Sequence, residues 1–345
     1  MGRGNDQEIS SKSYLRSLFS RFFKWAYELV SPRVRHRIAN LPGVLPAYKR
    51  TVKPLLFPAA AENGLAKVSF PTFTMYVDPK DTVGEMAIGA DWDAVTGQVF
   101  RRVIRPGDVV IDIGAHWGYF TLLAAILSTD SGKVYAFEPH PKNFALLAKN
   151  ISANRLSNVV AIQKAVSNYE GEARLFESRA SMGHSLAPLP EYLRVVKDSI
   201  PKAIPIDAVR LDDFFVTNPI RPRLVKMDIE GGEPSALEGM QALIKRSPEL
   251  VLITEFNYQF LDANSGKRFL ETLTGLGFET AVLDEERLRM EVMLPDEIVR
   301  RFLQSETRQV VNVLCTRGAE SVRELLGGEP LKPGESRIVK VKGPR

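Results

Sequence analysis

The sequence predicts an α/β protein built on a doubly wound, mostly parallel sheet. From Pro106 onward, short runs of β-branched and apolar residues alternate with longer runs of helical periodicity. Such alternation is typical of βαβ units, whose right-handed crossovers place parallel strands in one sheet. A chain of 345 residues is long enough for one large domain of this kind with extensions.

Seven segments are predicted as strands of this sheet. They are 108–114, 133–139, 158–166, 224–230, 249–256, 278–284 and 309–316. Runs with helical spacing follow several of them, at 119–128, 142–155, 234–246 and 267–277. Ligands of such sheets bind at the carboxyl ends of the strands, so residues at those ends are the functional candidates.

The domain organisation is predicted from the segments that flank or interrupt this alternation. Residues 1–69 form a basic, partly helical and Pro-rich extension, and residues 70–316 form the main domain, which begins with an alternating strand over 70–78. Residues 168–222 interrupt the alternation and are predicted as a substrate insertion with a β-hairpin and a mobile loop. Residues 317–345 form a C-terminal tail.

The charge distribution argues against a nucleic-acid partner. The net charge is +5, but residues 1–55 carry 11 basic and 3 acidic side chains, and residues 331–345 carry 5 and 1. The remaining 275 residues therefore hold 30 basic and 37 acidic side chains. A domain that grips phosphates would normally have the opposite balance.

One cysteine, Cys315, excludes an internal disulfide, and the four histidines form no ligand pair. A cytoplasmic location is therefore expected, since the N-terminus lacks the order of a signal peptide. Residues 14–30 form a basic amphipathic stripe. This stripe either contacts the inner face of a membrane peripherally or packs on the protein's own body or on a second subunit, as in a homodimer.

The strongest local signal follows the first predicted strand, where the turn reads GAHWG. Gly114 and Gly118 lack Cβ atoms, so a ligand can approach the backbone and φ can be positive. A simple tight turn would account for the glycines alone. Asp112 lies within an apolar strand, where burial without a partner is costly, and Glu138 ends the second strand, where a nucleotide ribose would lie.

This turn is not the GxGxxG fingerprint of dinucleotide-binding proteins. Asp112 lies two residues ahead of the first glycine, and its charge would repel the pyrophosphate that NAD places at a helix N-terminus. The same charge suits the cationic amino and sulfonium groups of S-adenosyl-L-methionine (SAM). We therefore favour SAM as the cofactor, with an NAD-dependent oxidoreductase as the alternative.

Three segments resemble the FkbM family of SAM-dependent methyltransferases. They are PGDVVIDIGAHWGYFTLLAA, KVYAFEPHPKNFALLAKN and LVKMDIEGGEPSALEGM, and the pair Trp92-Asp93 is similar to an aromatic–acid pair that precedes the first strand in that family. The resemblance covers about residues 75–285. It implies a Rossmann-like class I methyltransferase fold with a seven-stranded sheet, preceded here by the N-terminal helical extension.

The resemblance also implies a reaction and a set of contacts. The family transfers methyl groups mainly to oxygen, with hydroxyls of sugars, polysaccharides or polyketides as acceptors. We expect a hydroxylated small molecule or glycan as the partner. The implied cofactor contacts are Asp112, Gly114, Ala115, Gly118, Glu138, Pro139 and Ala165.

Methyl transfer to an alcohol needs a base, and acids gather where the fourth strand ends. Lys226, Asp228 and Glu230 share one face while the chain stays extended, and Glu255 ends the fifth strand at the same cleft. We interpret the acids as groups that bind the acceptor or remove its proton, and Lys226 as a catalytic residue or the neutralising partner of Asp228. His184, in the loop SMGHSL, is a further candidate base.

Two alternatives to this interpretation stay open. The acids could instead hold Mg²⁺ or Ca²⁺, although the resemblance does not require a metal. The chain could also be a methyltransferase-like module that has lost catalysis and docks on a membrane. The complete set of Asp112, Glu138 and the acids of the fourth strand argues against a non-catalytic module.

Overall fold

The computed structural model describes residues 64–81, 94–178, 181–186, 202–285, 289–303, 310–317 and 338–340. The chain divides into two compact units, residues 1–67 with 77–90, and residues 68–76 with 91–345. The second unit holds the elements that form the site. The stripe at 14–30 and the pair Trp92-Asp93 lie outside the described residues, so the predictions about them are not tested, and the predicted domain boundaries stay predictions.

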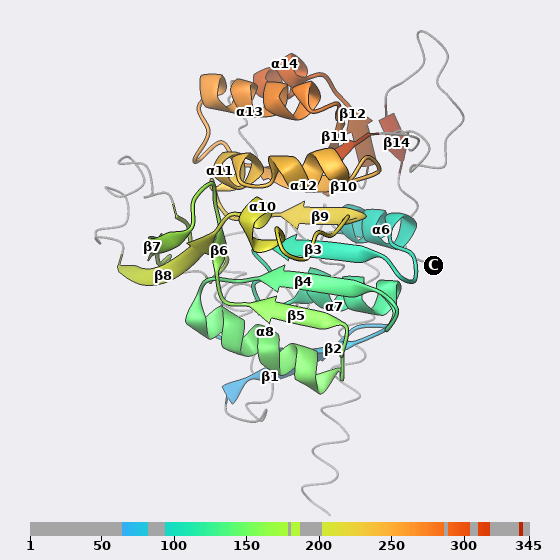
Figure 1. The fold of residues 1–345 in the computed structure, drawn as a ribbon, viewed down its shortest axis with the longest axis vertical. Coiled ribbons are helices and arrows are strands. Elements are labelled where there is room, and N and C mark those ends of the chain that lie inside the picture. Colours follow the sequence, from blue (N-terminus) through green and yellow to red (C-terminus); the bar gives the residue numbers. More distant parts are fainter. Residues whose placement is uncertain are drawn as a thin grey trace, which may run out of the picture. The chain divides into compact units, whose positions relative to one another are not determined.

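One large sheet organises the second unit (Figure 1). Its order is β14-β12-β11-β13-β10-β9-β3-β4-β5. The strands are β3 (Val109–Ile113), β4 (Lys133–Phe137), β5 (Val159–Ile162), β9 (Leu224–Met227), β10 (Val251–Phe256), β11 (Glu279–Asp284), β12 (Arg289–Val292), β13 (Val311–Thr316) and β14 (Ile338–Lys340). The five strands from β5 to β10 are parallel to their neighbours, and the pairings from β10 to β14 are antiparallel.

The predicted Rossmann-like fold is confirmed. All seven predicted strands are present, and they form the contiguous part of the sheet from β5 to β11. Two strands that the sequence did not predict, β12 and β14, extend this part at one edge. The predicted strand 158–166 is shorter than expected, because the chain leaves the large sheet after Ile162.

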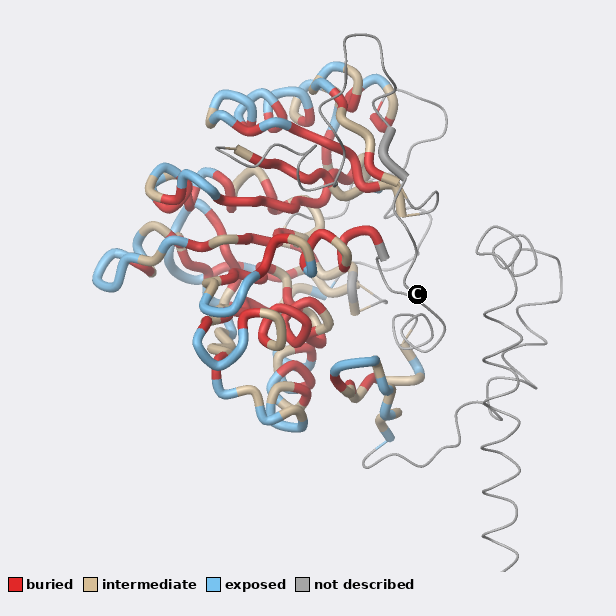
Figure 2. The backbone as a smooth tube through the Cα atoms, turned by 90° about the vertical axis from the view of Figure 1, so that its right-hand side faces the viewer, coloured by how far each residue is buried: buried red, intermediate tan, exposed pale blue. Residues whose placement is uncertain are grey.

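Helices lie on both faces of this sheet, as Figure 1 shows. They are α6 (Ala94–Val103), α7 (Tyr119–Ser128), α8 (Pro141–Ala153), α10 (Leu211–Phe214), α11 (Glu233–Glu238), α12 (Gln241–Arg246), α13 (Ala263–Gly275) and α14 (Pro295–Ile298), the last continued by a π-helical turn at Val299–Leu303. Buried residues follow the strands and the inner helix faces (Figure 2).

Alternation along β3 shows how the two faces differ. Ile111 and Ile113 pack in the main apolar cluster with residues of α11, α12 and α13. Asp112 points to the opposite face, where Thr121 of α7 donates a hydrogen bond to it. The only described charged side chain on β3 therefore faces α7 and not the main apolar cluster.

A second, three-stranded sheet follows β5, and two of its strands belong to the predicted insertion. Its order is β6-β8-β7, with β6 (Ala165–Val166), β7 (Gly171–Phe176) and β8 (Ala203–Val209). The pair β7 and β8 is antiparallel, as the predicted hairpin requires. A short 3-10 helix at Ser181–Gly183 follows β7.

A hairpin of β1 (Ala66–Ser69) and β2 (Thr74–Val77) precedes the main domain. The side chain of Asn150 on α8 accepts a hydrogen bond from the Tyr76 backbone N–H at 2.7 Å and donates one to its carbonyl at 3.1 Å. Asn154 makes the same pair of bonds with the backbone of Thr74. The two asparagines thus extend the hydrogen bonding of β2 in the way a neighbouring strand would.

The predicted helix 234–246 is interrupted at Gly239. A Cβ on Gly239 would lie 2.0 Å from the carbonyl oxygen of Ser167, so the chain packs closely there. The Gly239 carbonyl accepts from the Asp212 N–H, and the Asp212 carboxylate accepts from the N–H groups of Ala242 and Leu243. Asp212 therefore caps a new helix, and α11 and α12 replace the single predicted one.

Among the described residues, no helix is long and apolar enough to cross a membrane.

Gly114 lies where the ends of β3 and β9 pack closely against each other. Its φ is +81°, and a Cβ there would lie 1.9 Å from the carbonyl oxygen of Asp228. The adjacent Asp228 N–H donates to the Ile113 carbonyl at 3.1 Å, so the backbones of the two strand ends are in direct contact. Only glycine fits this position without moving one of the strand ends.

We predict that Gly114→Ala lowers the free energy of unfolding by at least about 3 kcal/mol, because positive φ and a backbone collision combine. Urea denaturation measures the loss. Gly275→Ala, at the end of α13, is the matched control, since nothing lies within 4 Å of its added Cβ and φ is not positive. An equal effect of both substitutions would contradict the packing argument.

Candidate active site

The carboxyl ends of four neighbouring strands form the candidate site. In the order β4-β3-β9-β10 each strand is parallel to the next, so these ends lie at one edge of the sheet. Glu138 follows β4, Asp228 follows β9, and Glu255 lies near the end of β10. The edge that the sequence predicted as the binding edge therefore carries the predicted acids.

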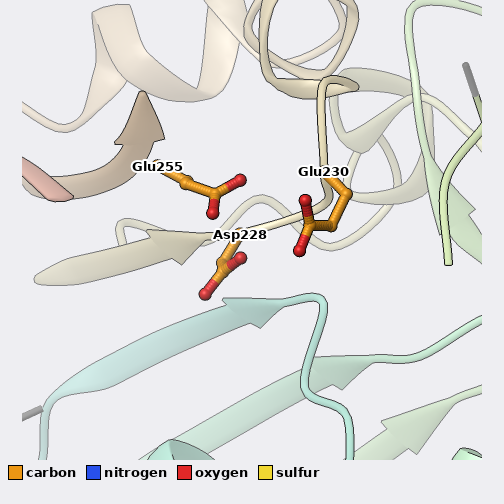
Figure 3. Close-up of side chains that lie close together, drawn as sticks. All are labelled: Asp228, Glu230 and Glu255. Carbon is orange, nitrogen blue, oxygen red and sulfur yellow. The ribbon is translucent and has the colours of Figure 1, made fainter. Parts of the chain in front are cut away.

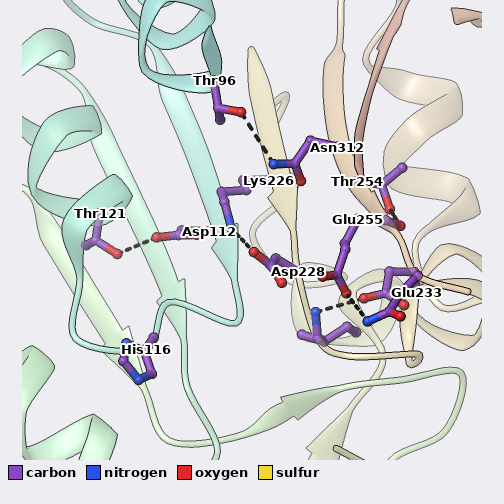
Figure 4. Close-up of polar contacts among 12 residues, drawn as sticks. Thr96, Asp112, His116, Thr121, Lys226, Asp228, Glu233, Thr254, Glu255 and Asn312 are labelled. Atoms are coloured by element: carbon purple, nitrogen blue, oxygen red, sulfur yellow. Dashed lines mark hydrogen bonds and ion pairs between the residues drawn. The ribbon is translucent and has the colours of Figure 1, made fainter. Parts of the chain in front are cut away.

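Asp112 is 1% exposed, and one of its carboxylate oxygens has no hydrogen-bond partner among the described residues. Its Oδ2 accepts a hydrogen bond from Thr121 Oγ1 at 2.6 Å (Figure 4). Its Oδ1 accepts none from any residue that the structure describes. Burial raises the pKa of Asp112, while the charge of Lys226 and the Thr121 hydrogen bond lower it. A buried oxygen with this unused capacity fits a cationic N–H donor on a ligand.

The glycines of the GAHWG turn make close contacts within the protein. Gly118 has a φ of +97° and stands before the first residue of α7. A Cβ there would lie 2.6 Å from Leu147 Cδ1 of α8, and Gly114 meets the Asp228 carbonyl as described above. At both glycines the space of the absent Cβ is filled by protein atoms, so their role as ligand contacts stays a prediction.

Glu138 holds the backbone of the segments that follow β3 and β4. Its Oε2 accepts from the His116 N–H at 2.8 Å, and its Oε1 accepts from the His140 N–H at 2.9 Å. Each oxygen has a second lone pair that a ligand hydroxyl can use. Burial raises the pKa of Glu138 to about 7, although the two backbone N–H groups lower it.

The three other implied cofactor contacts lie in different surroundings. Ala115 is buried, and its N–H donates to the Phe137 carbonyl at 3.0 Å. Pro139 is half-buried and follows Glu138. Ala165 lies on β6, in the apolar cluster of the three-stranded sheet. Pro139 is therefore next to Glu138 in the sequence, and Ala115 is bonded to the residue before Glu138. Ala165 belongs instead to the core of the second sheet.

Three carboxylates, which we call the acid cluster, converge at the ends of β9 and β10. Asp228, Glu230 and Glu255 each offer an oxygen within 4.8 Å of the others (Figure 3). The sequence predicted extended chain through Glu230, and this is wrong, because β9 ends at Met227 and Glu230 has a φ of +53°. A left-handed turn directs Glu230 into the cluster.

Asn257 links two members of the acid cluster, and the sequence analysis missed it. It is 2% exposed, and its Nδ2 donates to Glu230 Oε2 at 2.9 Å and to Glu255 Oε2 at 3.4 Å. The available signal was its position directly after the strand that ends in TEF. A polar residue at such a strand end belongs to the binding edge for the same reason as the acids do.

Glu230 and Glu255 hold their protons to higher pH than ordinary carboxyls do. Burial, and then the charge of Asp228, raise the pKa of Glu230 to about 8. The same causes raise the pKa of Glu255 well above its ordinary value. Carboxylates at this separation cannot all ionise, so the acid cluster can take up or release a proton. The same three oxygens could also hold a divalent cation.

Lys226 lies between the two parts of the site. Its side chain is buried, and its Nζ is 2.9 Å from Asp228 Oδ2 and 5.0 Å from the centre of the Phe120 ring (Figure 4). On the sheet, Lys226 is the register partner of Asp112 on β3. The ion pair with Asp228 that the sequence suggested is present, and the same ammonium also lowers the pKa of Asp112.

Glu233 closes the turn that carries Glu230. Its side chain is fully buried, and its two oxygens accept the N–H groups of Ile229 at 2.8 Å and Gly231 at 2.9 Å. Burial raises the pKa of Glu233 to about 7, although the N–H of Ile229 lowers it. Glu233 therefore holds the backbone of the turn.

His184 lies against the start of α8. Its Nδ1 accepts the Ser178 N–H at 2.9 Å, and its ring centre is 4.1 Å from that of His140. The His140 Nε2 is in turn 3.0 Å from Glu177 Oε1. The described contacts thus pair His184 with His140, outside the set of oxygens that forms the acid cluster.

Comparisons with known proteins give one family. The sequence profile of the methyltransferase FkbM domain matches residues 112–280. The chain is 32% identical over 161 residues to the 31-O-demethyl-FK506 methyltransferase FkbM of Streptomyces tacrolimicus, covering 40% of this chain and 61% of that protein. It is 28% identical over 144 residues to Methyltransferase 1 of Beauveria bassiana, covering 38% and 57%. The chain thus spans about three fifths of the length of these curated relatives.

Among solved structures, the methyltransferase FkbM of Methylobacillus flagellatus is similar at 16% identity and a TM-score of 0.36, over 64% of this chain and 50% of that one. The TYW2 protein of Pyrococcus horikoshii in complex with MeSAdo is similar at 12% identity and a TM-score of 0.36, over 74% and 71%.

The raised pKa of Glu255 makes stability depend on pH. Between its ordinary pKa of 4.5 and the higher folded value, the folded carboxyl binds a proton that the unfolded one has lost. This contribution to stability therefore falls as pH rises through that window, by at most about 1.4 kcal/mol per pH unit.

We predict that Glu255→Gln, which cannot ionise, raises the melting temperature relative to wild type, and that its advantage grows as the pH rises above the ordinary pKa of 4.5. Calorimetry at several pH values measures the difference. Glu172→Gln, an exposed position on β7, is the control and should show no such trend. An advantage that does not change with pH would contradict the protonated state of Glu255.

Proposed function

Residues 112–280 of this chain match the methyltransferase FkbM domain, and on that premise we propose that the protein transfers a methyl group from SAM to a hydroxyl oxygen. The observation that carries this proposal is the division of one sheet edge into two parts. A partly unpartnered buried carboxylate, Asp112, and Glu138 lie on the β3–β4 side, and the acid cluster lies on the β9–β10 side.

The β3–β4 side fits the cofactor. The unpartnered Oδ1 of Asp112 would accept a hydrogen bond from the amino group of SAM, and the carboxylate of Glu138 would accept from the ribose hydroxyls. When bound, SAM supplies a methyl group that is activated by the sulfonium charge. The buried negative charge beside the turn favours this cation over the pyrophosphate of a dinucleotide.

The acid cluster fits the acceptor side of the reaction. An alcohol must lose its proton as its oxygen is methylated, and a positioned carboxylate contributes typically 10²–10⁴-fold as a general base. We assign the role of base to Glu230, whose raised pKa of about 8 makes its ionised form more basic than an ordinary carboxylate. Asp228 and Glu255 can bind neighbouring hydroxyls of the acceptor.

The acceptor class follows from the charge of this side. Hydroxyl groups donate hydrogen bonds to carboxylates, whereas a phosphate or carboxylate on the acceptor would be repelled by the ionised carboxylate that acts as the base. The relative from Streptomyces tacrolimicus is named for methylation at an oxygen, 31-O, which supports the same chemistry. We infer a neutral, polyhydroxylated acceptor such as a sugar, a glycan or a natural product.

The cofactor assignment is tested by Glu138→Ala and Glu138→Gln. Both should weaken binding of S-adenosylhomocysteine at least about tenfold, because hydrogen bonds to a charged acceptor are lost. Isothermal titration measures this, with Glu172→Ala as an exposed control. Undiminished affinity in both variants would contradict the assignment, and tighter binding of NAD than of S-adenosylhomocysteine by the wild type would favour an oxidoreductase.

The base assignment predicts a pH profile. Transfer of label from methyl-labelled SAM to a polyhydroxylated fraction of a host-cell extract should rise from pH 7 to pH 9 with a midpoint near 8, as Glu230 loses its proton. Glu230→Gln and Asp228→Asn should bind S-adenosylhomocysteine like wild type but transfer about 10²-fold more slowly. Full activity of Glu230→Gln would exclude it as the base, and restoration of activity by Mg²⁺ after treatment with EDTA would assign the acid cluster to a metal.

A further inference from the structure

Residues 181–186 of the insertion contact three of the strand ends that form the site. The Oγ of Ser181 is 2.6 Å from His116 Nε2 in the turn after β3, and its carbonyl accepts from Asn143 Nδ2 at 3.2 Å. The ring of His184 packs on His140, two residues after Glu138. The hydroxyl of Ser185 donates to the Glu230 carbonyl at 2.5 Å, in the turn after β9.

Ser185 is itself held firmly in place. It is 2% exposed, and it exchanges two backbone hydrogen bonds with Phe176 at the end of β7, at 2.8 and 3.2 Å. The adjacent Leu186 packs against the apolar cluster of the three-stranded sheet. The hydroxyl of Ser185 is therefore presented from a fixed backbone, and its contact with Glu230 joins the insertion to the acid cluster.

Glu230 needs such support because its backbone is strained. Glu230, a non-glycine residue, has a φ of +53°, a strained conformation that persists only where surrounding contacts determine it. Glu233 holds the amides on both sides, Asn257 holds the carboxylate, and Ser185 holds the carbonyl. Of these contacts, the one from Ser185 is the only one that comes from the insertion.

We propose that Ser185 is a positioning residue, whose hydroxyl keeps the Glu230 turn in the conformation that directs the Glu230 carboxylate at Asp228 and Glu255. The insertion is then part of the active site even where it does not touch the reacting atoms. The role of Ser185 in catalysis rests on the proposed function, whereas its effect on the turn does not depend on the reaction.

The first test is hydrogen exchange of the full-length protein, read by mass spectrometry on peptides that cover 226–234. In Ser185→Ala the amides of the Glu230 turn should exchange roughly fivefold to tenfold faster, as the loss of one buried hydrogen bond of about 1 kcal/mol or more implies. Ser181→Ala is the matched control: it removes a hydroxyl from the same segment but should accelerate exchange around His116 instead. Unchanged exchange at 226–234 in Ser185→Ala would overturn the proposal.

The second test separates positioning from a general loss of structure. In the label-transfer assay, Ser185→Ala should lower kcat about tenfold and leave KM for SAM unchanged. In a Glu230→Gln background the same substitution should have no further effect, because Ser185 acts through Glu230. Equal losses in both backgrounds would overturn the positioning role. If the wild type transfers no label, the proposed function fails, and the exchange result still decides whether Ser185 holds the turn.

Discussion

The burial of several carboxylates at one edge of a parallel sheet is the constraint on which this structure depends. An ionised carboxyl loses much of its hydration when buried, so each one needs a compensating donor, a cation or a proton. The compensation differs from residue to residue. Glu138 and Glu233 each accept two backbone N–H groups, and Asp228 pairs with Lys226.

Glu230 and Glu255 are compensated least. Both share the single amide of Asn257, and burial together with the charge of Asp228 favours their protonated forms. The pKa values of Glu138 and Glu233 are also raised, to about 7, but their oxygens are engaged by backbone N–H groups, so these two carboxyls hold the chain. Carboxyls with a raised pKa and few fixed donors are suited to proton transfer. The cost of burial is therefore offset mainly by fixed N–H donors at the residues that build the edge, and mainly by a proton at the two residues that we propose for the chemistry.

Much of the site follows from the sequence because parallel strands bring their carboxyl ends together. The positions of Asp112, Glu138, Asp228 and Glu255 required only the prediction of four strands and their order along the chain. The turn at Glu230 did not follow, because its positive φ depends on Glu233, Asn257 and Ser185, which lie at unrelated distances along the sequence. Likewise, the break in the helix at Gly239 depends on packing against Ser167. The short strands β12 and β14 were not predicted because their segments show too weak an alternation of apolar and polar residues.

The central claim is that the two sides of this edge bind SAM and a hydroxyl acceptor. The most direct measurement is the chemical form of the product after incubation of the wild-type protein with methyl-labelled SAM and a host-cell extract. The account predicts label in a neutral, polyhydroxylated product as a methyl ether, which survives mild alkali. Label that alkali releases as methanol from an ester, label on nitrogen, or no SAM-dependent labelling at all would contradict it.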